Sequence, residues 1–126
     1  MFNKGRGAIA LTTFTSKMWV IGGWAGGCGH SNCSDVWYST DGSSWTQSTS
    51  DLGAGSYGHS AASTSSKIYV FGGSYGSSNL FWYSSDGITW SSLTFPSGTL
   101  LHSDSNNVIH DGAIWLAGAS KVWKLK

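Results

Sequence analysis

Short apolar runs, each bounded by Gly, Ser, Asn or Asp, follow one another along the whole chain. The runs are rich in β-branched and aromatic residues, and no window carries the 3.6-residue stripe of an amphipathic helix. This pattern predicts an almost entirely β fold. The expected strands are 8–13, 18–22, 35–39, 45–47, 59–63, 68–72, 80–84, 90–93, 101–105, 113–117 and 121–125.

A second regularity is a segment that occurs twice, with a spacing of 45 residues between its tryptophans and Asp-Gly steps and of 50 residues between its glycine pairs. The recurring positions are a glycine pair, two tryptophans and an Asp-Gly step, at Gly22, Gly23, Trp37, Asp41, Gly42 and Trp45 in one copy and Gly72, Gly73, Trp82, Asp86, Gly87 and Trp90 in the other. A period of this size is typical of repeat proteins, whose units bury their apolar faces only by stacking. We therefore predict stacked β modules.

The two Asp-Gly steps each stand between apolar runs. Glycine readily adopts positive φ and aspartate tolerates it, so the pair is typical of a tight β-hairpin turn. We expect these residues, like the recurring glycines, to be structural. We also expect Trp45 and Trp90 to be buried at equivalent positions of successive units.

The order of these elements resembles the kelch repeat of β-propellers. Gly58-His59-Ser60 and Leu101-His102-Ser103 are similar to the Gly-His-Ser that opens many kelch units. The chain departs from this pattern at Ala8-Ile9-Ala10 in the first unit and at Ala117-Gly118, which replaces the glycine pair, in the third. The turn at 84–90 resembles a shortened Asp-box of sialidases, which is a structural turn in that family.

The resemblance implies that 1–126 is a single segment of a β-propeller built from four-stranded blades. Blade 1 would cover about 6–50, blade 2 about 55–95 and an incomplete blade 3 about 99–126, with 1–4 as a candidate for its missing strand. Propellers close with about four to eight blades, so three are too few. We predict a homodimer whose two copies close one six-bladed propeller, because twofold dimers are the commonest closed assemblies.

Charge and composition narrow the choice of partners. Charged residues make up 10% of the chain, the formal net charge is +1 and Arg6 is the one arginine, so we expect no nucleic-acid partner. No apolar stretch is long enough to span a bilayer. The abundance of Ser, Thr, Gly and Asn favours an extracellular or secreted protein, although no signal peptide is recognisable in the sequence.

The candidate chemistry is sparse. Cys28, His30 and Cys33 could serve a metal, but structural zinc takes four ligands, so we favour a Cys28–Cys33 disulfide and leave free thiols as an alternative. For His59 and His102, which recur in successive units, bonding between units is a better interpretation than catalysis. No catalytic motif is recognisable, and one arginine cannot build a sialidase-like site. We predict a non-enzyme with no cofactor and no metal.

The binding hypothesis depends on aromatic residues after the glycine pairs. Trp24 and Tyr75 stand among small polar residues there, which is typical of loops that contact a sugar ring or a protein side chain. The predicted function is a non-catalytic, self-assembling scaffold for protein interaction. The alternative is a glycan-binding module, with Trp24 and Tyr75 as the contacts.

Overall fold

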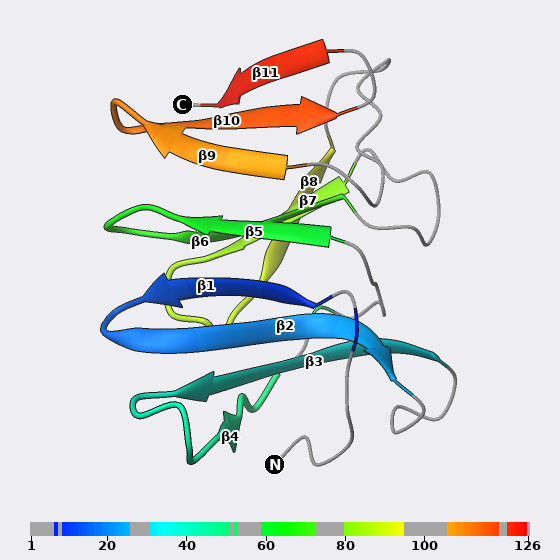
Figure 1. Ribbon diagram of the computed structural model, residues 1–126, viewed down its shortest axis with the longest axis vertical. Coiled ribbons are helices and arrows are strands. Elements are labelled where there is room, and N and C mark those ends of the chain that lie inside the picture. The colour runs from blue at the N-terminus through cyan, green and yellow to red at the C-terminus, as the bar shows by residue number, and fades with distance from the viewer. Residues whose placement is uncertain are drawn as a thin grey trace.

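The computed structural model describes residues 7, 9–25, 31–50, 52, 59–72, 80–94, 106–118 and 121–125. All of the secondary-structure elements in this part of the chain are β-strands, which confirms the predicted all-β class. The strands form three antiparallel sheets (Figure 1).

The sheets follow the sequence order of their strands. Sheet 1 has the order β1-β2-β3-β4, sheet 2 the order β5-β6-β7-β8 and sheet 3 the order β9-β10-β11. The strands are β1 (Ala10–Phe14), β2 (Lys17–Ala25), β3 (Ser31–Ser39), β4 (Thr46–Gln47), β5 (His59–Ser63), β6 (Ile68–Gly72), β7 (Leu80–Ser84), β8 (Ser91–Thr94), β9 (Asn106–His110), β10 (Ala113–Gly118) and β11 (Lys121–Leu125).

The clearest departure from the predicted strands is β9. The expected strands leave 106–112 as the connection between 101–105 and 113–117, whereas 106–110 form β9 and the turn is confined to Asp111-Gly112, where both residues have positive φ. The polar start of β9 is accommodated because Asn107 Nδ2 donates a hydrogen bond to Ala61 O of sheet 2, at 3.1 Å. The predicted strand 101–105 lies outside the described residues.

From the sequence we expect the glycine pair of the first unit to end its strand. β2 instead continues through the pair to Ala25. The β2–β3 register shifts between Ile21 and Gly23, and both glycines have positive φ. A Cβ on Gly23 would lie 2.9 Å from Gly7 O. The pair therefore forms a bulge that lets the preceding chain lie against β2.

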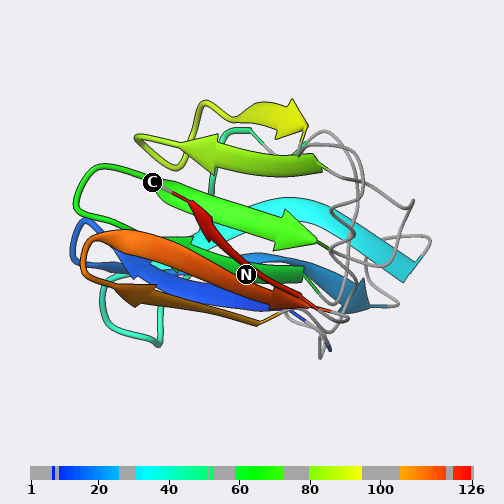
Figure 2. The ribbon, with the colours of Figure 1, turned by 90° about the horizontal axis from the view of Figure 1, so that it is seen from above.

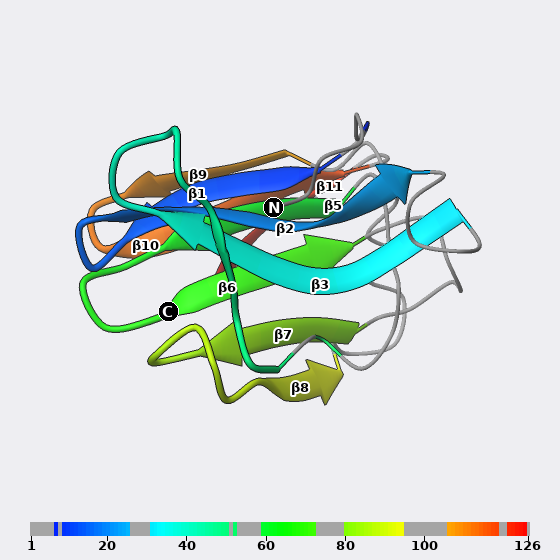
Figure 3. The same ribbon diagram turned by 90° about the horizontal axis from the view of Figure 1, so that it is seen from below.

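The three sheets spread out from their first strands. β1, β5 and β9 lie side by side and run in the same direction, with β5 in the middle (Figure 1). Sheets 1 and 3 extend to opposite sides of sheet 2 (Figure 1), while β7 and β8 lead away from β1 and β9 in the views from above and below (Figures 2 and 3). In the described residues the sheets form an open fan rather than a closed ring.

Two apolar cores lie between neighbouring sheets. Side chains alternate between the two faces of a strand. Sheet 2 therefore packs one face against sheet 1 and its opposite face against sheet 3. The first core contains Ala10, Phe14, Trp19, Ile21, Val36, Leu52, Ile68, Val70 and Trp82. The second contains Ala62, Phe71, Phe81, Ile114 and Leu116. Each sheet is thus buried only against its neighbours.

The Asp-Gly turns have the same hydrogen bonds in both units. In the first, Ser39 Oγ accepts from the Gly42 N–H at 2.8 Å, while Asp41 Oδ1 accepts from the Ser43 and Ser44 N–H groups at 2.8 Å each. The backbone N–H groups of Ser44 and Ser43, together with the Ser39 hydroxyl, hold the pKa of Asp41 below its usual 3.8.

The second turn repeats this geometry around Ser84 and Asp86, and the N–H groups of Thr89 and Ile88 lower the pKa of Asp86. The surroundings of the two turn glycines nevertheless differ. A Cβ on Gly87 would overlap the indole ring of Trp19, whereas a Cβ on Gly42 would meet only Met18 Cε, at 3.3 Å. The second turn therefore sits directly on the Trp19 ring of sheet 1.

We expect Gly87→Ala to destabilise the fold by about 2–4 kcal/mol. Positive φ costs an alanine about 1 kcal/mol, and overpacking against Trp19 adds about 1–3 kcal/mol. Gly112→Ala is the matched control, because Gly112 also has positive φ but has nothing within 4 Å of its Cβ position. Urea denaturation measures both variants, and equal losses would contradict the Trp19 contact.

Candidate interaction surface

The contact between sheets 1 and 2 centres on Trp19. Its ring is 1% exposed, packs beside Tyr38 at 5.1 Å between centroids and donates from Nε1 to Phe14 O at 3.0 Å. Lys17 Nζ lies 4.5 Å from the centroid of the Tyr38 ring. Sheet 2 covers this aromatic face with Ile68, Val70 and the Gly87 turn.

Sheet 2 presents a similar aromatic face to sheet 3. Tyr69, Phe71, Phe81 and Tyr83 form a group of neighbouring rings with centroids 5.9 to 6.5 Å apart. Lys67 Nζ lies 5.1 Å from the Tyr83 ring, as Lys17 lies near Tyr38. Ile114 and Leu116 of β10 cover part of this face. The same kind of contact therefore occurs twice in succession.

The third face of this series is on sheet 3, where no described element packs against it. Ile114 and Leu116 point toward sheet 2, so Trp115 and Ala117, which alternate with them, lie on the opposite face. Val108 pairs with Trp115 and Val122 with Ala117, which places both valines on that face. The valines are 60% and 65% exposed. We call this set, Val108, Trp115, Ala117 and Val122, the open face.

The open face repeats details of the two buried faces. Lys124 Nζ lies 5.2 Å from the Trp115 ring, and the face borders a hollow of about 210 Å³ with an almost wholly apolar lining. Trp115 Nε1 is buried without a hydrogen-bond partner, whereas Trp19 Nε1 has one. The exposed apolar side chains and the hollow make the open face a candidate interaction surface.

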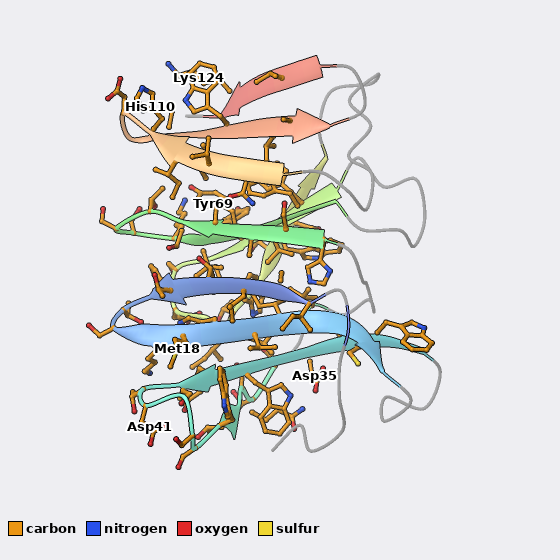
Figure 4. All side chains as sticks on the ribbon, viewed as in Figure 1. Met18, Asp35, Asp41, Tyr69, His110 and Lys124 are labelled. Atoms are coloured by element: carbon orange, nitrogen blue, oxygen red, sulfur yellow. The ribbon has the colours of Figure 1, made fainter. Side chains whose placement is uncertain are left out.

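The other extremity of the fan carries the Asp41-Gly42 turn. Figure 4 shows Asp41 at the outer end of sheet 1, with Lys124 at the far end of sheet 3. Gly42 has the backbone conformation of Gly87, with φ of 78° against 77°, but it is exposed and no indole ring lies within 4 Å of its Cβ position. One end of the fan thus has the open face with the partly buried Trp115, and the other end has an exposed glycine turn.

His59 joins sheets 1 and 2. It is 5% exposed, and its Nε2–H donates to Ile21 O at 2.8 Å. In the neutral imidazole the proton is therefore on Nε2, and Nδ1 carries none. Nδ1 has no partner, and burial lowers the pKa of the imidazole below 6.5. The side chain acts as a link between units. Its counterpart His102 lies outside the described residues.

The aromatic pair proposed from the sequence is not brought together in the described residues. Trp24 is 53% exposed but belongs to β2 rather than to a loop, and its backbone exchanges hydrogen bonds with Gly7 at 2.8 and 3.0 Å. Tyr75 lies outside the described residues. A joint ligand contact of these two residues stays a prediction.

Other predicted site residues have varied surroundings. Cys33 is 2% exposed and disulfide-bonded, while Cys28, the other cysteine of the chain, lies outside the described residues, as does Gly73. Trp37 and Trp82 are almost fully buried, at 8% and 9% exposure. Trp45 and Trp90 are only partly buried, so the expectation of full burial is wrong.

A second cavity, of about 480 Å³, lies between the outer parts of sheets 1 and 2. Its lining consists of Gln47, Ser48, Thr49, Ser50, Leu52, Trp82, Trp90 and Ser92. Sequence reasoning missed this site because its residues come from two repeat units and include no charged group. The only sequence signal was the pair of tryptophans, which the repeat made look structural.

The described residues contain no group of three or more His, Cys, Asp or Glu side chains that could hold a metal ion. In the same part of the chain no helix has the length and apolar character to cross a membrane. Compared with known proteins, the chain matches no family model and no curated protein. The geometry of the surfaces therefore carries the functional argument.

The buried neutral state of His59 predicts that stability decreases on acidification. The pKa is lower in the folded chain than the 6.5 of an unfolded one, so protons bind preferentially to the unfolded state below about pH 6.5. Urea midpoints should therefore fall between pH 7.5 and 5.5. His59→Gln, which keeps a side-chain N–H for Ile21 O, should reduce this fall. An equally large fall in the variant would contradict the role of His59.

Proposed function

We propose that the protein is a non-catalytic, self-associating β-propeller segment of the kelch type, and that the assembled ring serves as a scaffold for protein interaction. The observation that carries the proposal is the pair of uncovered ends. Inside the chain, the Gly87 turn packs on Trp19. Trp115 is the equivalent of Trp19 and the Gly42 turn is the equivalent of the Gly87 turn, and these two lie at opposite ends of the fan.

The arrangement of the sheets supports a ring. β1, β5 and β9 lie side by side and are the innermost strands from which the sheets spread, as in propeller blades around an axis (Figure 1). In a dimer, the open face of sheet 3 would pack on sheet 1 of the second copy. Each copy supplies both halves of the contact, so two copies close the ring by a twofold axis with six blades.

The energy balance also favours closure. The open face exposes two valines beside a tryptophan, and burying one large apolar side chain stabilises by about 1.5–3 kcal/mol. In the described residues, β11 also has one edge with no paired strand. Such edges recruit a further strand, and we assign residues 1–4 of the second copy to this place.

The assembly should depend on the small size of Gly42. We expect the wild-type chain to sediment at twice its 13.3 kDa mass, and Gly42→Asn to shift it toward the monomer, because the added side chain would collide with Trp115 of the second copy. Asparagine tolerates positive φ, so the turn itself is preserved. Gly112→Asn is the matched control and should remain dimeric.

Trp115→Ala should weaken the dimer by about thirtyfold or more, since buried tryptophans that anchor an interface contribute about 2 kcal/mol or more. Ile88→Ala, which truncates a 45% exposed apolar side chain at the second Asp-Gly turn, away from both ends of the fan, should leave the dissociation constant nearly unchanged. Sedimentation equilibrium over a concentration series measures both. A wild-type chain that stays monomeric at every concentration would contradict the proposed assembly.

A further inference from the structure

The cavity between sheets 1 and 2 has the composition of a ligand site. Its volume, about 480 Å³, lies in the range of small-molecule pockets, about 300–1,000 Å³. All of its lining residues come from a single chain, on β4 and the segment after it, β7, and the region of β8. The site therefore exists independently of any assembly between copies.

Trp90, one of the lining residues, carries a buried indole N–H without a hydrogen-bond partner. In the first turn, Trp45 Nε1 donates to Gly42 O at 3.2 Å. In the second turn, the equivalent carbonyl, Gly87 O, accepts from Ser48 Oγ at 3.0 Å, and Trp90 Nε1 is buried without a partner. Leaving a buried donor unsatisfied is unfavourable, so a ligand that accepts this hydrogen bond would bind more tightly.

The remaining lining determines the class of ligand. The described polar groups are serine and threonine hydroxyls and the amide of Gln47, each of which both donates and accepts and none of which is charged. Trp82, Trp90 and Leu52 supply apolar surface. A neutral molecule with many hydroxyls and a flat C–H face satisfies both sets of groups, which is the chemistry of a sugar ring.

We propose that this cavity binds a neutral carbohydrate unit, with Trp90 Nε1 donating to a sugar hydroxyl and Gln47 and Ser92 among the polar contacts. The site differs from the one expected around Trp24 and Tyr75. Because the residues of only one chain form it, binding and dimerisation fail separately: a monomeric chain that still binds sugar would contradict the proposed assembly and support this site.

The test uses the full ¹⁵N-labelled chain and the methyl glycosides of glucose, galactose, mannose, fucose and N-acetylglucosamine as probes. At least one glycoside should shift the indole N–H resonance of Trp90, which is identified by its loss in Trp90→Phe. That variant keeps an aromatic ring but removes the donor, so titration should show roughly five- to tenfold weaker binding. Gln47→Ala should also weaken it.

Trp45→Phe is the matched control, because Trp45 occupies the same place in the first turn and does not line the cavity. Its affinity for the glycosides should equal that of the wild type. The proposal is overturned if no glycoside at millimolar concentration moves the Trp90 resonance, or if Trp45→Phe and Trp90→Phe weaken binding equally. Equal binding of glucuronic acid would show that the site does not select neutral ligands.

Discussion

The seating of the Gly87 turn on the Trp19 ring is the interaction on which the arrangement of the sheets depends. A tight hairpin with a glycine at positive φ brings the backbone close enough to lie on an indole face, and no other residue type leaves room for it. Ser48 then holds Gly87 O, and His59 holds Ile21 O at the inner side of the same junction. Together these contacts fix how far sheet 2 is rotated from sheet 1, and the apolar side chains between them fill the remaining space.

The repeat made much of this architecture predictable. β5, β6, β7 and β11 have the predicted bounds, since each is a short β-rich run between turn residues. The Asp-Gly turns also follow from local chemistry, because their hydrogen bonds join residues within three positions of one another. β9 was missing from the predicted strands, because the contact that accommodates its polar start, a hydrogen bond from Asn107 to Ala61, joins residues 46 positions apart in the sequence.

The candidate sites were harder to predict, because equivalent positions in a repeat need not have equivalent surroundings. Trp45 and Trp90 match in sequence, yet one bonds to its own turn and the other lines a cavity between sheets. The difference arises because Ser48 donates to Gly87 O, the acceptor that Trp90 would otherwise use. The position equivalent to Ser48 in the second unit is Leu93, which has no hydroxyl. Trp115 and Trp19 differ in a similar way, since among the described residues only Trp19 is covered by a neighbouring sheet.

The side-by-side order of β1, β5 and β9 has a consequence for how the protein opens. Each sheet is held by its neighbours alone, so sheet 1 or sheet 3 can detach at the loss of one core, whereas sheet 2 is released only when both cores are lost. Transient opening is therefore a property of the two ends of the array. In the single chain we expect the middle sheet to exchange most slowly with the unfolded ensemble, because among the described residues it is the sheet with apolar packing on both of its faces.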